Sequence, residues 1–229
     1  AWVVQDKMPW WQLNADYSTG VGESQRVVLE DGTVVQLNSS SAINVAYTAQ
    51  QRIVMLLRGE IHIATAHEPA KRRPFLVASD QGSMRALGTQ FVVRQLTNDK
   101  DSPIKIGVLE GAVEVAPNEL STKVRLQAGE QLSFTRHMLT PVEPILPYDT
   151  AWLKRMLVAD DMPLAEFLAE LSRYRKGSLS CDDSIKHLKV SGTYPLEDTD
   201  KVIDMLQQSL KLEIRMLTRY WVRLMPASV

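Results

Sequence analysis

Three side chains near the middle of the sequence, Glu60, His62 and His67, are the best candidates for metal chemistry, because carboxylate and imidazole groups bind divalent metal ions. Glu60 and His62 are two positions apart and would share one face of a strand. His67 lies past the end of that strand, beside Glu68 and Pro69. A compact metal site would need two histidines two positions apart and a further ligand, so we predict no metal site and no cofactor.

Nucleophilic catalysis also lacks a candidate. No serine lies in a Gly-x-Ser-x-Gly segment, and no glycine-rich loop for phosphate precedes a helix. The single cysteine, Cys181, has only His187 near it in sequence, and it cannot form an internal disulfide. We expect Cys181 to be an inert strand residue and the protein not to be an enzyme. A metal-dependent enzyme that binds zinc, iron or nickel through His62 remains an alternative.

The composition predicts one large or two ordinary folded domains, because 45% of the 229 residues are hydrophobic. Basic and acidic side chains nearly balance, 26 against 27, which argues against a nucleic-acid partner or an anionic membrane surface. The longest apolar run, residues 53–57, is far shorter than the roughly 20 residues of a membrane-spanning helix. The sequence starts without a methionine or a signal-peptide pattern, so we expect a processed product or an excised piece.

Short alternating apolar segments separated by glycines run from about Ala15 to Phe134, a pattern typical of strands joined by tight turns. The segment 27–37 reads as a hairpin, since Asp-Gly tolerates the positive φ angles of a primed turn. Four dipeptides of this kind each precede an alternating segment, namely Asp31-Gly32, Arg58-Gly59, Glu110-Gly111 and Ala128-Gly129. We therefore predict an all-β sandwich, barrel or solenoid over residues 12–138.

Three prolines at positions 141, 144 and 147 predict a semi-rigid linker over residues 139–149. Beyond it, Pro163 should open a helix and Gly177 should take a left-handed cap conformation. Asp198 or Thr199 should cap a second helix. The apolar stripes of these helices are expected to be Leu164, Phe167, Leu168 and Leu171 in the first, and Val202, Ile203, Leu206 and Leu210 in the second.

The remaining segments of this tail alternate as strands, and the last two, around residues 212–216 and 220–224, should form a closing hairpin. The predicted order is strand, helix, strand, strand, helix, strand, strand. The fold class is therefore mainly β plus α+β, with a small α+β domain over residues 150–229.

Several phrases of the β region together resemble the FecR domain. They are LEDGTVVQLN at 29–38, LRGE at 57–60, PFLV at 74–77, ALGTQF at 86–91, VLEG at 108–111 and LQAGE at 126–130. The tail, about residues 157–226, resembles the short N-terminal module of secretins and TonB-dependent receptors, with MPLAEFL at 162–168 as its helix start.

The resemblance implies the periplasmic part of a FecR-type sigma regulator, whose parent protein is anchored in the inner membrane. Its implied partner is the N-terminal signalling domain of a TonB-dependent outer-membrane siderophore transporter, and its implied role is the control of iron-uptake transcription. A complete regulator of this family also has a cytoplasmic segment that holds the sigma factor and one transmembrane helix. We recognise neither in this sequence, so sigma-factor binding and membrane anchoring are expected through those missing segments only.

The last strand is the predicted binding site for this partner. If Tyr220, Val222 and Leu224 face the core, Trp221 and Met225 face outward, and we expect this strand to be an open sheet edge to which another chain can add. An alternative is that Trp221 covers the linker. The residues predicted to bind the partner are Leu179, Leu217, Tyr220, Trp221, Arg223 and Met225.

Two other interpretations stay open. A carbohydrate- or peptidoglycan-binding structural protein would present aromatic residues along one β face, although Trp10, Trp11, Tyr17 and Tyr47 are scattered along the sequence. Leucines also repeat every seven residues, at 157, 164 and 171 and again at 210, 217 and 224. These series are too short for a coiled coil, and we expect them to be domain core.

Overall fold

The structure is a computed structural model that describes residues 15–66, 73–97, 99, 101–218 and 220–227. The chain divides into two compact units. Among the described residues, the first, here called the β unit, holds residues 15–20 and 24–145, and the second, the tail unit, holds residues 21–23 and 146–227. Within the described ranges no helix is both long and apolar enough to cross a membrane.

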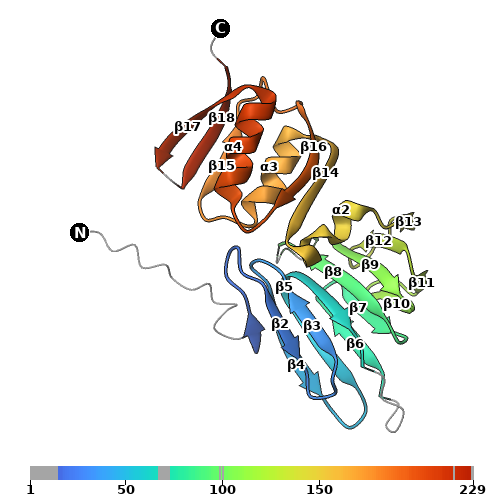
Figure 1. Cartoon of the computed structure of the whole chain (residues 1–229). Coiled ribbons are helices and arrows are strands. Elements are labelled where there is room, and N and C mark those ends of the chain that lie inside the picture. Colours follow the sequence, from blue (N-terminus) through green and yellow to red (C-terminus); the bar gives the residue numbers. More distant parts are fainter. Residues whose placement is uncertain (1–14, 67–72, 98, 100, 219, 228–229) are drawn as a thin grey trace. The chain divides into compact units, whose positions relative to one another are not determined.

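The β unit is built from strands that hydrogen-bond into one 13-stranded sheet (Figure 1). Their bounds are β1 Tyr17–Ser18, β2 Gln25–Val28, β3 Val34–Leu37, β4 Ala42–Tyr47, β5 Arg52–Ala64, β6 Phe75–Ala78, β7 Gly82–Ala86, β8 Gln90–Gln95, β9 Ile104–Glu110, β10 Ala112–Pro117, β11 Val124–Gln127, β12 Glu130–Phe134 and β13 Glu143–Pro144. The predicted mainly β architecture is confirmed, and it takes the form of a curled sheet.

Strand β5 connects the parts of this sheet, because it pairs with four other strands. Its first half pairs with β4 on one side and, in parallel, with β6 on the other. Its second half pairs with β3 and β8. From β6 the sheet continues through β7 and β10 to β11, and from β8 it continues through β9 and β12 to β13. One long strand therefore joins two four-stranded arms and their hairpins.

The face of β5 that meets the core changes along its length. Val54 and Leu56 are buried in the first half, at even positions, whereas Ile61 and Ile63 are buried in the second half, at odd positions. A strand has a side-chain period of two, so an irregularity must shift the phase by one residue. That irregularity lies in the pairing with β4, between Ala42 and Ile43, next to Gly59.

Gly59 makes this irregularity possible. Its φ is +96°, a conformation that L side chains rarely adopt, and a Cβ there would overlap the side chain and Cα of Ser41. Ser41 in turn bridges the backbone of Glu60, because its hydroxyl accepts from the Glu60 N–H at 2.9 Å and donates to the Glu60 carbonyl at 3.0 Å. Our prediction of a tight turn at Arg58-Gly59 is thus wrong, because the chain continues as a strand through a bulge.

The other glycine turns form as expected. Gly32, Gly111 and Gly129 have φ of +85°, +74° and +87°. They lie between β2 and β3, between β9 and β10, and between β11 and β12 respectively.

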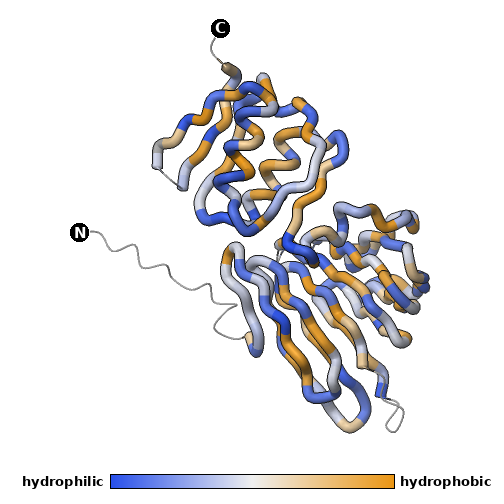
Figure 2. Tube along the Cα trace, viewed as in Figure 1, coloured by the Kyte–Doolittle hydropathy of each residue, from blue (hydrophilic) through white to orange (hydrophobic). Residues whose placement is uncertain are grey.

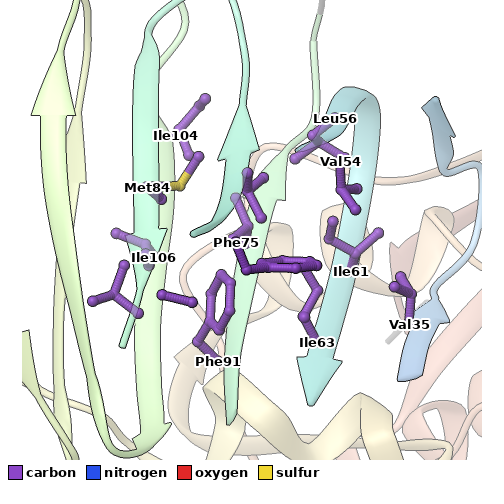
Figure 3. Close-up of a cluster of buried hydrophobic side chains, with 14 of the residues drawn as sticks. Val35, Val54, Leu56, Ile61, Ile63, Phe75, Met84, Phe91, Ile104 and Ile106 are labelled. Carbon is purple, nitrogen blue, oxygen red and sulfur yellow. The ribbon is translucent and has the colours of Figure 1, made fainter. Parts of the chain in front are cut away.

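A single hydrophobic cluster fills the inside of the curled sheet (Figure 3). Phe75 and Phe91 lie at its middle and are almost fully buried. Around them pack aliphatic side chains from both halves of β5 and from β3, β7 and β9, as Figure 3 shows for Val35, Val54, Leu56, Ile61, Ile63, Met84, Ile104 and Ile106. The hydropathy trace shows the same alternation along the strands (Figure 2).

A buried ion pair fastens the β2–β3 turn to β5. The Arg52 guanidinium lies 2.7 Å from the Asp31 carboxylate, with side-chain exposures of 7% and 0%. The hydroxyls of Thr33 and Tyr47 also donate to Asp31, at 2.7 and 3.1 Å. Burial raises the pKa of Asp31, but these hydrogen bonds outweigh burial, so its pKa lies below the ordinary value.

The proline-rich stretch that we expected as a linker contains short regular elements. Glu143 and Pro144 form β13 and pair with β12 at the end of the β unit. Pro147–Thr150 forms α2, and Ala151–Lys154 forms the 3₁₀ helix η1, both in the tail unit.

The tail unit also contains β14 Met156–Pro163, α3 Leu164–Ser172, β15 Ser178–Cys181, β16 Lys189–Pro195, α4 Thr199–Leu210, β17 Leu212–Thr218 and β18 Trp221–Pro226. The predicted order of strands and helices from β14 onward is confirmed. Pro163 precedes α3 as its N-cap, one position earlier than expected, and Asp198 caps α4 by accepting from the Lys201 N–H at 3.0 Å.

Helices α3 and α4 of the tail unit lie between two small sheets (Figure 1). One sheet has the order β15-β18-β17, and the other pairs β14 with β16. The expected stripes of α3 and α4 are buried, except that Leu210 is only partly buried. Leu157, Leu164, Leu171 and Leu224 are all buried, which confirms that these members of the leucine series are core.

Replacing Gly59 with Ala should lower the free energy of unfolding by about 2–4 kcal/mol, since it adds backbone strain and an overlap with Ser41. The control is Gly129→Ala, at a similar φ but with open space around the added Cβ, which should cost about 1 kcal/mol. Urea denaturation of both variants checks this. Equal losses would contradict the role given to Ser41.

Replacing Asp31 with Asn should lower the free energy of unfolding by about 3 kcal/mol at neutral pH, because Arg52 would keep a buried charge without its counterion. The stabilisation from Asp31 is present above the unfolded pKa, near 3.8, and is lost as pH falls through the lower folded pKa. Denaturation from pH 7 to pH 2 should therefore show a shallower acid loss in the variant. Glu114→Gln, which breaks the exposed pair with Lys123, should cost less than about 1 kcal/mol.

Candidate partner-binding site

The sheet β15-β18-β17 has one face packed on the helices and one face open. In β18, Val222 and Leu224 are buried, whereas Trp221 and Arg223 are exposed. Because side chains alternate across a strand, Val222 and Leu224 point to the helices and Trp221, Arg223 and Met225 to the opposite face. We name this opposite face of the three strands the open face.

Strand β18 is the central strand of this sheet. It pairs in parallel with β15 and antiparallel with β17. Our prediction that β18 is an open edge is therefore wrong, because its backbone groups are used on both sides. Within the described residues, the strands of this sheet that pair on one side only are β15 and β17.

The register brings side chains from all three strands together on the open face. Trp221 lies opposite Ser178 on one side and Thr218 on the other. Arg223 lies opposite Ser180 and Arg215 in the same way. All of these residues except Thr218 line a groove of about 650 Å³, together with Met225. Met216 and Val222, which lie opposite each other, also line this groove.

Trp221 is the most exposed large apolar side chain in the part of the chain that the structure describes, at 60%, followed by Met216 at 59%. Single exposed apolar residues are common, but here an indole and two thioethers line one groove. Tryptophan and methionine contribute large contact areas when a partner buries them. The open face therefore has the composition of a protein-binding surface.

The turn before Trp221 is fixed by Gly177. Its φ is +100°, and a Cβ at this position would overlap the carbonyl of Tyr220. The Ser178 N–H donates to the same carbonyl at 2.7 Å. The left-handed conformation predicted for Gly177 is confirmed, and it holds the start of β18 against β15.

Arg223 is oriented by Asp182. Its guanidinium donates to the Asp182 carboxylate at 3.1 Å. Hydrogen bonds from the Ser184 backbone and hydroxyl lower the pKa of Asp182, with a smaller contribution from Arg223. Asp182 is therefore ionised at neutral pH and holds Arg223 beside Ser180.

The structure brings together three of the six residues predicted to bind a partner, namely Trp221, Arg223 and Met225. Leu179 pairs with Val222 and so lies on the face that carries the buried side chains. Tyr220 is exposed in the turn before β18. The backbone of Leu217 lies in β17, and its side chain is outside the described part of the structure.

Sequence reasoning missed Arg215, Met216, Ser178 and Ser180. Arg215 could have been found, because it alternates with Leu212 and Ile214 along β17. Its position opposite Arg223 could not, since the register of β17 and β18 includes a shift between Met216 and Thr218. The two serines needed the parallel pairing of β15 with β18, which joins residues about 40 positions apart.

The residues considered for other chemistry have structural contacts. The buried Glu60 carboxylate accepts from the Asn38 amide at 2.9 Å, and burial lowers the pKa of the neighbouring His62. Burial raises the pKa of the Cys181 thiol, which keeps it protonated at neutral pH. His67 lies outside the described residues.

Of the aromatic residues considered for carbohydrate binding, Tyr47 donates its hydroxyl to Asp31, and Tyr17 packs against the hydrophobic cluster. Trp10 and Trp11 lie outside the described residues. The two described tyrosines therefore lie on the face of the sheet that packs on the hydrophobic cluster.

Residues 15–114 match the family model described as FecR protein. The predicted FecR resemblance is confirmed for this part of the chain, which forms most of the β unit. A comparison with curated proteins found no match.

Two crystal structures of a proposed anti-sigma factor from Parabacteroides distasonis ATCC 8503, at 2.50 and 1.65 Å resolution, are similar to the chain, with TM-scores of 0.72 and 0.73. Each is 23% identical and is aligned over 93% of this chain and over 98% and 99% of its own length. At this identity the similarity shows a shared fold, and it covers both units.

The two faces of β18 should respond differently to truncation. Trp221→Ala should change the free energy of unfolding by less than about 0.5 kcal/mol, since the indole is mostly in solvent. Val222→Ala should cost about 2 kcal/mol through lost burial and a cavity beneath the helices. Thermal and urea denaturation of the two variants check this, and a large loss for Trp221→Ala would mean that the indole is part of the core.

Proposed function

We propose that this chain, which carries a FecR domain over residues 15–114, is the periplasmic relay part of a membrane-anchored sigma regulator. Its partner is the N-terminal signalling domain of a TonB-dependent outer-membrane siderophore transporter. Through this contact the regulator controls the transcription of iron-uptake genes.

The FecR match and the fold shared with a proposed anti-sigma factor support a signal-relay regulator over an enzyme. The iron and siderophore part of the proposal comes from the sequence resemblance of the tail to secretins and TonB-dependent receptors. Two further observations support that resemblance. From β14 onward the tail unit has the predicted β-α-β-β-α-β-β order, and α3 and α4 lie between two small sheets.

The observation that carries the proposal is the open face of the β15-β18-β17 sheet. Its centre is Trp221, with Met216 and Met225 in the same groove. A tryptophan side chain has few rotatable bonds, so a partner can bury the indole at little entropic cost, and tryptophan and arginine are enriched among the residues that dominate binding free energies at protein interfaces.

The charges on this face predict an acidic partner surface. Arg215 and Arg223 lie directly opposite each other on neighbouring strands. Two guanidinium groups at this spacing repel each other, and a carboxylate from a partner between them would relieve the repulsion and form bidentate hydrogen bonds. Asp182 already pairs with Arg223, so Arg215 is the cation more available to the partner.

A relay requires that the partner bind differently in its two states. If siderophore occupancy changes how the transporter's signalling domain meets the open face, the difference in binding free energy between the states is the signal. A contact of a few side chains around one tryptophan suits this role, because a small displacement of the partner exposes the indole again.

The test is calorimetric titration of the full chain with the cognate signalling domain. Trp221→Ala should weaken binding about tenfold or more, and Arg215→Glu should weaken it further in proportion to the acidity of the partner surface. The matched controls are Met205→Ala on α4 and Arg26→Glu on β2, two exposed residues away from the open face. These should bind as the wild type does.

No heat and no complex at 200 µM of each protein would contradict the proposal. Equal affinity of Trp221→Ala and the wild type would instead remove the open face as the contact. Stability measurements on the same variants separate a lost contact from a lost fold.

A further inference from the structure

The outer edge of β17 is a second surface with the features of a binding site. Within the described residues β17 pairs with β18 alone and is an outer strand of its sheet (Figure 1). The N–H and C=O groups of every second residue of β17 therefore point away from the sheet. The shift in pairing lies at its far end, between Met216 and Thr218. The segment Leu212–Met216 is therefore a regular strand edge of five residues.

Other edges in the protein are protected in ways that β17 is not. The Asp16 carboxylate accepts from the Val45 N–H at 2.8 Å on the edge of β4. The outer strand β2 exposes Gln25 and Arg26, and the outer strand β11 exposes Arg125 and Gln127. Charged and polar side chains of this kind discourage strand addition. The edge of β17 also carries charges, Glu213 and Arg215, but they are of opposite sign and can pair with each other across a two-fold axis. Its other face carries Ile214 and Met216, the first partly and the second largely exposed.

The sequence of this segment, LEIRM, is complementary to itself when reversed. A two-fold axis through Ile214 would place Glu213 of one chain opposite Arg215 of the other, twice, and Leu212 opposite Met216, also twice. Paired residues of an antiparallel ladder share a face, so a two-fold axis perpendicular to the sheet allows pairings centred on single residues only. Centring on Glu213 or on Arg215 would oppose like charges, whereas centring on Ile214 opposes unlike charges at both positions.

We propose that the chain forms a two-fold symmetric dimer by antiparallel pairing of its β17 strands, centred on Ile214. The occupant of the edge is a second copy of this chain. The three-stranded sheets of the two copies then form one six-stranded sheet, with Ile214 and Met216 covered on the helix side and Glu213–Arg215 ion pairs on the other side. Among described residues, no carboxylate of its own chain pairs with Arg215, so this guanidinium gains a counterion on dimerisation.

This dimer goes beyond the proposed function. The pairing uses the outer edge of β17, whereas the proposed transporter contact centres on Trp221 in the middle of the sheet. Arg215 takes part in both contacts, so Trp221→Ala and Glu213→Arg are the variants that separate them. In the dimer two copies of the open face lie side by side, so two signalling domains can bind one dimer.

Sedimentation equilibrium of the full chain from 1 to 200 µM tests the proposal. The mass should rise with concentration from 25.8 kDa towards twice that value. Arg215→Glu should raise the dimer dissociation constant at least about tenfold, because carboxylates would then face each other at both positions. Glu213→Arg should do the same with guanidinium groups. The control Arg26→Glu should leave the constant unchanged.

Mixing the two single variants gives the decisive result. One chain then carries carboxylates at both positions and the other carries guanidinium groups at both, so an equimolar mixture should dimerise while each variant alone does not. The double variant Glu213→Arg/Arg215→Glu should also dimerise, since it exchanges the charges and keeps their pairing. Circular dichroism of each variant confirms that the fold is kept.

A wild-type chain that stays monomeric at 200 µM would overturn the proposal and leave the edge to a different occupant. A wild-type dimer that both single variants leave unchanged, or a mixture that stays monomeric, would overturn the Ile214-centred pairing. A wild-type chain that dimerises but does not bind the transporter's signalling domain would count against the proposed function alone.

Discussion

The bulge of β5 at Gly59 is the constraint on which the β unit depends. A strand without it would keep one set of side chains inside along its whole length, and Ile61 and Ile63 would face away from the cluster that Val54 and Leu56 enter. The bulge moves the phase by one residue, so that one continuous strand pairs with β4 and β6 first and with β3 and β8 afterwards. Ser41 fixes it by bonding both backbone groups of Glu60 where a Cβ on Gly59 could not fit.

The buried polar groups of the β unit serve this same curled sheet. Asp31 and Arg52 tie the β2–β3 turn to the start of β5, and Asn38 satisfies the carboxylate of Glu60 just after the bulge. Burying these groups is unfavourable unless each finds its partner, so they stabilise one arrangement of the strands over others. Glu60, one of the residues that looked suited to metal chemistry in the sequence, is thus explained by the folding of β5.

The tail unit differs from the β unit because one of its sheets has a face that its own helices do not cover. Its helices are covered on both sides by small sheets, and a three-stranded sheet has one face left over after it has packed on them. In many proteins such a face is polar. Here it carries Trp221, Met225 and two opposed arginines, a composition that gains free energy when another protein covers it. The outer strand of the same sheet is β17, and the backbone N–H and C=O groups along its outer edge can pair with another strand.

The sequence by itself determined the local elements, because the information for them is short-range. Alternation predicted the strands, Asp198 the start of α4 and Gly177 the turn before β15. The alternation of Trp221 with Val222 and Leu224 also predicted which side chains of the last strand are outward. The FecR phrases predicted the match of residues 15–114 to the FecR family model, since most of them join a glycine to the apolar residues that flank it.

Only the tertiary structure decided how these elements pair. An Arg-Gly pair can make a turn or a bulge, and the choice at Gly59 depends on Ser41, which is 18 residues away. The last strand looked like an edge because its hairpin partner is adjacent in sequence, whereas its other partner, β15, is about 40 residues distant and pairs in parallel. Strand pairing between distant segments leaves almost no trace in local sequence, so the open face and its arginine pair appeared only once the chain was folded.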